Sequence, residues 1–97
     1  MPSITRDSVV TVGRDQVASD LAGETVLLSL KTARYYGLVD VGARIWSLVQ
    51  KEPVRVSAIC ETISREYDVA LERCEADVVK FLEELSSNGL IEVDGGS

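Results

Sequence analysis

The hydrophobic pattern of this chain changes its period near residue 39, and that change constrains the fold more than any other feature. Before it, short apolar runs alternate with turn residues, which is typical of strands. After it, apolar residues recur about every 3.6 positions, which is typical of helices that pack through one face. The sequence therefore predicts a sheet first and helices second.

Runs with strand composition fill the first part of the chain. They lie at residues 9–12, 17–21, 25–30 and 34–38, separated by Gly13-Arg14-Asp15, Ala22-Gly23-Glu24 and Lys31-Thr32-Ala33. Connections this short join antiparallel neighbours, so we expect a small meander that ends with strand 34–38. Such a last strand has a row of N–H and C=O groups that another chain can pair with.

Helical periodicity then predicts the remaining elements. The first helix begins with Asp40 as its N-cap and ends before Pro53, which cannot continue it. A second helix spans about 56–66 and lacks a good capping residue. The third spans about 71–87 and ends at Asn88-Gly89, a left-handed stop. A short strand at 90–93 and a polar, flexible tail from Asp94 to Ser97 complete the chain.

These elements outline an α+β protein of the winged helix-turn-helix type. It has a small three-stranded antiparallel sheet followed by three helices and a short C-terminal strand. A chain of 97 residues has room for one modest core, so we expect a single domain over residues 1–97.

Composition excludes several classes of function. The net charge of −6 disfavours nucleic acid and anionic membranes as partners. The third helix, which would read DNA in a winged helix, carries more acidic residues than basic ones, so a transcription regulator is a remote alternative. An acyl carrier, suggested by Asp7-Ser8-Val9, is equally remote because that motif precedes a strand. The segment Met1–Asp7 lacks the apolar stretch of a signal peptide, which predicts a cytoplasmic protein.

The residues of catalytic and metal sites are scarce. The chain has no histidine, and Cys60 and Cys74 fall on different predicted helices without CxxC spacing. We expect two buried free thiols, no metal, no cofactor and no enzymatic activity.

From about residue 26 to residue 93 the sequence resembles the PqqD-like proteins, also called RiPP recognition elements. The order and spacing of several short motifs carry the resemblance: Leu27-Leu28, Tyr35-Tyr36-Gly37-Leu38, Gly42-Ala43-Arg44-Ile45-Trp46, Ile59, Tyr67-Asp68-Val69, Asp77-Val78-Val79, Phe81-Leu82, Leu85 and Asn88-Gly89-Leu90-Ile91. Lys31 and Ala70 depart from the family pattern, which has proline and a capping residue there.

The residues of two of these motifs, Tyr35-Tyr36-Gly37-Leu38 and Gly42-Ala43-Arg44-Ile45-Trp46, are most similar to those of the leader-recognition proteins of lasso-peptide biosynthesis. The resemblance implies a non-catalytic adaptor for the leader of a precursor peptide, with a leader bearing tyrosine and proline. It also implies two enzyme partners, a leader-cleaving cysteine protease and an asparagine-synthetase-like macrocyclase. A PqqD-type chaperone for a radical-enzyme pathway is the alternative within the family.

The family binds its leader as an antiparallel strand added to the third strand of the sheet, beside the third helix. Here that strand is 34–38, in which the period of two places Tyr36 and Leu38 toward the core. The resemblance places the groove between this strand and one flank of the third helix. The predicted peptide-binding residues are Arg34, Tyr35, Tyr36, Gly37, Leu38, Cys74, Asp77, Val78, Phe81 and Glu84.

Overall fold

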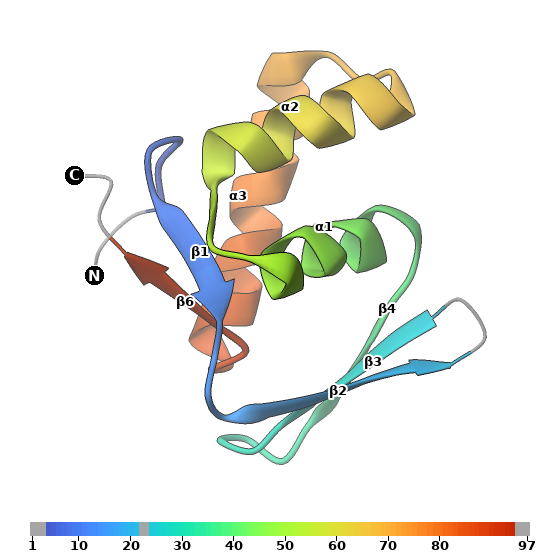
Figure 1. Ribbon diagram of the computed structural model, residues 1–97, viewed down its shortest axis with the longest axis vertical. Coiled ribbons are helices and arrows are strands. Elements are labelled where there is room, and N and C mark those ends of the chain that lie inside the picture. Colours follow the sequence, from blue (N-terminus) through green and yellow to red (C-terminus); the bar gives the residue numbers. More distant parts are fainter. Residues whose placement is uncertain (1–3, 22–23, 95–97) are drawn as a thin grey trace.

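The computed structural model describes residues 4–21 and 24–94, and Figure 1 shows two small sheets around three helices. The elements are β1 (Val9–Val12), β2 (Gln16–Leu21), β3 (Glu24–Ser29), β4 (Tyr35–Leu38), α1 (Asp40–Lys51), β5 (Val54–Arg55), α2 (Val56–Tyr67), α3 (Leu71–Ser87) and β6 (Ile91–Asp94). The predicted α+β class, with a three-stranded meander, three helices and a C-terminal strand, is confirmed. No helix in the described part is long and apolar enough to cross a membrane.

The strands form two antiparallel sheets of three strands each, with the orders β2-β3-β4 and β5-β1-β6. The expectation that run 9–12 opens the meander is wrong, because β1 lies between β5 and β6. Asp94 was expected in a flexible tail, yet it pairs with Val9 at the end of β6. The rest of that tail, 95–97, lies outside the described residues, as does most of the turn predicted at Ala22-Gly23.

A close backbone approach at Gly13 explains why β1 leaves the meander. The Gly13 N–H donates to the Leu90 carbonyl at 2.9 Å, and a Cβ at Gly13 would lie 2.5 Å from the Gly89 carbonyl oxygen. Only glycine fits against that backbone. After β1 the chain therefore bends at Gly13, passes the end of α3 and continues into β2. As a result β1 and β2 lie in different sheets and do not form a hairpin.

The helices follow the predicted bounds closely, but their N-terminal caps differ. Val39 is the N-cap of α1, so the prediction that Asp40 caps this helix is wrong. Asp40 is already the first helical residue and has a φ of 51°, which leaves its carboxylate in the first turn, near the positive end of the helix dipole. No side-chain hydrogen bond from the N-cap residue caps the N-terminus of α1, α2 or α3.

The C-terminus of α3 ends in a Schellman motif. The Gly89 N–H donates to the Ser86 carbonyl and the Leu90 N–H donates to the Leu85 carbonyl, while Gly89 has a φ of 73°. Ser29 ties this end of α3 to β3, because its hydroxyl donates to the Asn88 carbonyl at 2.7 Å. The motif therefore fixes the meander against the last turn of α3.

One face of the meander packs on the helices. Leu27 and Leu38 point inward and are buried, and they join a core that includes Ile45, Trp46 and Leu82. In Figure 1 the helices lie on one side of this sheet, which leaves its other face outward. The outward face has exposed apolar side chains, among them Val17, Leu21 and Tyr35. The meander is thus covered on one side only.

Candidate functional site

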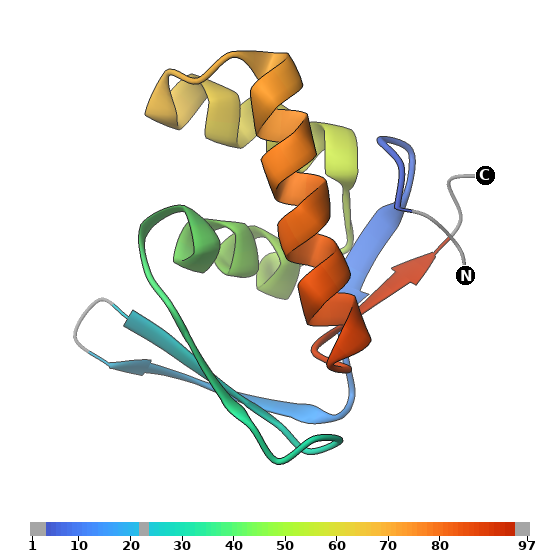
Figure 2. The same ribbon diagram turned by 180° about the vertical axis from the view of Figure 1, so that it is seen from behind.

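The strand β4 is an open edge of the meander. Within the part of the chain that the structure describes, it pairs with β3 alone, and in Figure 2 it lies at the near edge of the sheet. The Ser29 N–H donates to the Arg34 carbonyl, so in the antiparallel ladder the next hydrogen-bonded residues of β4 are Tyr36 and Leu38. The N–H and C=O groups of Tyr35 and Gly37 therefore point away from β3, toward the free edge.

The side chains of β4 alternate as the sequence predicts. Leu38 is buried and Tyr36 is half-buried against the core, whereas the Tyr35 side chain is 72% exposed on the outward face. Gly37 is also exposed and has no side chain of its own at the edge. Another strand can therefore approach the edge without a steric obstacle at Gly37.

A groove of about 550 Å³ runs between β4 and the C-terminal half of α3. All five predicted residues from Arg34 to Leu38 line it, together with Phe81 and Glu84 from α3. Leu85 and Asn88 also line it and were not predicted as site residues. The groove thus unites the strand and helix residues that the resemblance to PqqD-like proteins predicts.

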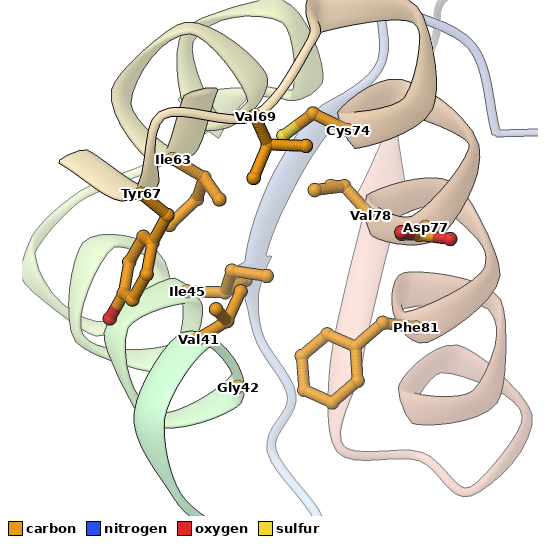
Figure 3. Close-up of a pocket in the computed structure, with 10 residues that line it drawn as sticks. All are labelled: Val41, Gly42, Ile45, Ile63, Tyr67, Val69, Cys74, Asp77, Val78 and Phe81. Carbon is orange, nitrogen blue, oxygen red and sulfur yellow. The ribbon is translucent and has the colours of Figure 1, made fainter. Parts of the chain in front are cut away.

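A second hollow, an apolar cavity of about 280 Å³, lies between the three helices (Figure 3). Of the predicted residues, Cys74, Asp77, Val78 and Phe81 line it from α3. The residues that sequence reasoning missed come from α1, α2 and the loop after α2: Val41, Gly42, Ile45, Ile63, Tyr67 and Val69. Ligand pockets for small molecules usually exceed about 300 Å³, so this cavity suits a side chain better than a substrate.

Phe81 belongs to both hollows and joins them. Figure 3 shows its ring pointing from α3 toward α1, opposite Val41 and Gly42. A Cβ at Gly42 would lie at ordinary contact distance, 3.5 Å from Phe81 Cζ and 3.8 Å from the Leu38 Cβ, so the ring leaves room there for nothing larger than a methyl group. The predicted residues therefore do not share one pocket: Cys74, Asp77 and Val78 line the cavity, while the β4 residues and Glu84 line the groove.

The polar groups near the two hollows are few. Asp77 and Glu84 are exposed, which places their carboxylates at the rims, while Arg34 is exposed at the opposite wall of the groove. Arg44 links α1 to α2 through a bidentate ion pair with Glu66, at 2.9 and 2.8 Å. This hydrogen-bonded pairing raises the pKa of Arg44 and lowers the pKa of Glu66, so both groups stay charged.

The two thiols are free and buried, as predicted. The Cys74 thiol donates to the Cys60 carbonyl at 3.5 Å, which packs α3 on α2 beside the cavity. Burial raises the pKa of the Cys60 thiol to about 11 and also raises that of Cys74. Both thiols therefore stay protonated at neutral pH and are poor nucleophiles.

Other candidate chemistry finds little support in the described residues. No group of three or more His, Cys, Asp or Glu side chains among them is placed to hold a metal ion. Ser8, the serine of the carrier-like motif, is buried and accepts a hydrogen bond from the Thr5 N–H at 2.9 Å. It is therefore not accessible for attachment of a prosthetic group.

The sequence that forms this strand and these helices matches a known protein family. Residues 24–91 match the family model described as coenzyme PQQ synthesis protein D, PqqD. The chain belongs to the PqqD family. The match begins at β3 and ends in β6, so it covers β4, all three helices and both hollows of this PqqD-family protein. Among curated proteins, none matches the chain.

Solved structures agree with this family. TbiB1, solved in complex with the TbiA(beta) leader peptide, is 36% identical, with a TM-score of 0.77 over 84% of this chain and 94% of TbiB1. Lasso peptide synthetase B1, complexed with its leader peptide, is 19% identical, with a TM-score of 0.75 over 86% of this chain and 96% of that chain.

A third structure is the PqqD truncation of Methylobacterium extorquens PqqCD, described as a functional, stand-alone RiPP recognition element. It is 23% identical, with a TM-score of 0.74 over 93% of this chain and 95% of that chain. The predictions of a PqqD-like RiPP recognition element and of a winged helix-turn-helix fold are thereby confirmed. Proteins of this family bind peptides without catalysing a reaction, so this family member is not an enzyme.

Proposed function

We propose that this protein binds the leader segment of a ribosomally made precursor peptide as an antiparallel strand added to β4. The observation that carries the proposal is the open edge of β4, where the backbone groups of Tyr35 and Gly37 have no strand partner among the described residues and lie beside the groove of α3. Strand addition of this kind obtains affinity from main-chain bonds and selectivity from pockets for alternate side chains. The chain is 36% identical to TbiB1, a protein whose structure was solved with a leader peptide, and this similarity supports the assignment.

The contacts at both ends of β4 indicate which part of an antiparallel peptide would lie beside which part of α3. Leu38 lies near Phe81, whereas the Arg34 end lies near Asn88, because Ser29 bonds to both Arg34 and Asn88. A peptide antiparallel to β4 therefore has its N-terminal part at Phe81 and the cavity, and its C-terminal part toward Asn88. Peptide side chains opposite Tyr36 and Leu38 point toward α3, and those between them point outward.

The strength of these contacts fits reversible binding. Tyr35 and Gly37 offer about four ladder bonds of roughly 0.5 to 1.5 kcal/mol each, and two apolar anchors add about 1.5 to 3 kcal/mol each. Ordering a disordered leader costs about 2 to 5 kcal/mol, and association entropy is a further cost. We expect micromolar affinity or somewhat tighter, which allows the peptide to pass to an enzyme.

The finer assignment is to lasso-peptide biosynthesis. The motif Tyr35-Tyr36-Gly37-Leu38 and the motif that ends in Trp46 support it, and the fold that the chain shares with lasso peptide synthetase B1 is compatible with it. In this role the protein presents the precursor to a leader-cleaving cysteine protease and an asparagine-synthetase-like macrocyclase. A leader with tyrosine and proline suits the apolar surface around Phe81.

A PqqD-type chaperone for a radical-enzyme pathway is the second candidate, and the match to the PqqD model favours it. The two candidates differ in the peptide that they bind. A synthetic lasso leader and a synthetic leader from a radical-enzyme pathway, titrated in parallel, separate them through the difference in Kd. A tighter complex with the second peptide would transfer the assignment.

An N-methyl scan of a fluorescent lasso leader, read by anisotropy, tests strand addition on the intact protein. Leader residues opposite Tyr35 and Gly37 direct their N–H groups at β4, and their immediate neighbours direct theirs away. We expect N-methylation to weaken binding at least about tenfold at two positions that are two residues apart, through a lost bond and a steric clash. Methylation between those positions leaves the Kd nearly unchanged.

Alanine substitution in the same peptide gives the matched control. Its strongest effects should fall one residue out of phase with the N-methyl effects, because side chains that point toward α3 belong to residues whose N–H groups point away from β4. N-methyl effects without this period of two would refute strand addition to β4, even if the leader binds.

A further inference from the structure

The carboxylate of Glu24 lies over Gly37, at the free edge of the meander. Glu24 is the first residue of β3, and a Cβ placed on Gly37 would lie 2.7 Å from Glu24 Oε1 and 3.7 Å from Glu24 Cδ. The carboxylate thus occupies the space that a side chain at position 37 would fill. This space is on the outward face, beside the edge where the proposed leader strand pairs.

Glu24 is a single charge on an otherwise uncharged surface. The outward residues of the three strands follow from the ladder register, and in the described chain Glu24 is the one charged residue among them. The others are mostly apolar, and the side chains of Val17, Leu21 and Tyr35 are 51%, 61% and 72% exposed. A cationic group of a bound peptide therefore has one counter-charge on this face of the described strands.

The geometry of an added strand places one peptide side chain next to this carboxylate. The backbone groups of Gly37 point to the free edge, so the peptide residue opposite Gly37 pairs with it through hydrogen bonds and has its side chain on the outward face. Directly opposed Cβ atoms lie about 4.5 to 5.5 Å apart. Since the Glu24 carboxylate lies over Gly37, the end of a long peptide side chain at this position can reach it.

We propose that Glu24 selects a lysine or arginine at the leader position directly opposite Gly37. This inference rests on the proposed function, because it requires a leader strand on β4. The flexible stem of a basic side chain can bend over the outward face so that its charged end meets the Glu24 carboxylate above Gly37. The exposed ring of Tyr35, a diagonal neighbour on the same face, can pack against the stem or face the cation. The net charge of −6 favours the same sign of partner.

The test combines charge reversals in the protein and in the peptide. A synthetic lasso leader and versions with each lysine or arginine singly changed to glutamate are titrated against the wild type, Glu24→Gln and Glu24→Lys. Glu92→Lys is the matched control, because Glu92 is an exposed glutamate on a strand of the other sheet and undergoes the same charge change. Titrations run at low salt and again at high salt, where exposed ion pairs are screened.

We expect Glu24→Gln to weaken binding of the unmodified leader about two- to fivefold at low salt, the range for an exposed ion pair. Glu24→Lys should weaken it further, while Glu92→Lys changes the Kd less than twofold. One of the leader variants with glutamate in place of a basic residue should bind the wild type more weakly than the unmodified leader does. The same variant should regain affinity for the Glu24→Lys protein. That residue must be one of the two positions at which N-methylation blocks binding.

Two results would overturn the assignment of Glu24 and leave strand addition intact. One is tight leader binding in which Glu24→Lys behaves like Glu92→Lys with every peptide. The other is coupling to a leader residue outside the two N-methyl-sensitive positions. If the wild type binds none of the leaders, the proposed function itself fails, and the inference about Glu24 fails with it.

Discussion

Phe81 is the residue on which the two hollows depend, because its ring forms a wall of both. The ring packs directly over position 42: its nearest atom lies 3.5 Å from where a Cβ would be, so a methyl group fits there but a larger side chain would displace the ring. Gly42 is thus part of the site although it is in α1 and contributes no polar group. Sequence reasoning assigned it to the family motif but gave it no role in the site.

Substitution of Gly42 tests whether the cavity takes part in binding. Gly42→Leu places a branched side chain where the Phe81 ring and the cavity now lie, so we expect at least tenfold weaker binding of a lasso leader. Gly42→Ala adds only an ordinary contact and should keep the affinity, while raising the free energy of unfolding by about 0.5 to 1 kcal/mol. Anisotropy and urea unfolding measure the two effects. Equal leader affinity of both variants would exclude the cavity from the site.

The pKa of Cys60 has a consequence for stability in alkaline solution. In the folded protein this pKa is about 11, whereas an unfolded thiol ionises near 8.5. Between these values the unfolded state loses the proton and the folded state keeps it, so the stabilisation present below about pH 8.5 is lost as the pH rises toward 11. The difference corresponds to about 3 kcal/mol.

Urea unfolding of the wild type and of Cys60→Ala from pH 8 to pH 11 measures this loss. We expect the unfolding free energy of the wild type to fall more steeply above pH 9 than that of the variant. Cys60→Ala is less stable at pH 8, because it leaves a cavity, so the slopes and not the absolute values are compared. Parallel slopes would contradict the burial-shifted pKa.

At the scale of elements, α3 fixes the position of the groove because its last turn is held in a defined place. The Schellman motif at Gly89 and the bond from Ser29 to Asn88 hold that turn against the meander. The Gly13 backbone passes the same turn closely. The end of α3 is therefore where the two sheets and the helix meet.

Gly89→Ala tests the contribution of this turn. Alanine at a φ of 73° has an unfavourable left-handed conformation, and its Cβ would lie 3.2 Å from the Lys31 Cδ. We expect a loss of about 1 to 2 kcal/mol in the free energy of unfolding, measured in urea. Gly42→Ala, a helical glycine, is the control and should change stability in the opposite direction. A neutral Gly89→Ala variant would mean that the turn does not need the left-handed conformation.

The elements that were predictable from the sequence are those whose signals are local. The helical spacing of the apolar residues in α3 and the Asn88-Gly89 stop predicted the bounds Leu71–Ser87 correctly. Both signals lie within the helix or directly beside it. The partner of β1 was not predictable, since Gly13-Arg14-Asp15 is as suitable for a hairpin as for a bend. That choice depends on the approach of Gly13 to Gly89, which is distant in sequence.

At the scale of the whole molecule, the candidate site was predictable in part for the same reason. The period of two identified the inward and outward residues of β4, and the family motif placed β4 beside α3. The contributions of α1 and α2 were missed because the cavity exists only once three helices pack together. For that reason Cys74, Asp77 and Val78 were assigned to the groove, whereas they line the cavity.

The fold as a whole leaves one backbone edge open next to these hollows. The helices cover the inner face of the meander and β6 lies with β1 in the other sheet, so β4 is left beside α3 without a second partner in the described chain (Figures 1 and 2). If a leader adds to β4 as a strand, it must therefore hydrogen-bond to the free edge groups, which are those of Tyr35 and Gly37.

Amide hydrogen exchange, followed by NMR with and without a saturating lasso leader, tests this central claim most directly. The account predicts that exchange slows markedly at Tyr35 and Gly37, whose N–H groups face the free edge. Tyr36 and Leu38 should change much less, because their N–H groups already bond to β3. A saturated complex in which Tyr35 and Gly37 exchange as fast as in the free protein would contradict strand addition to β4.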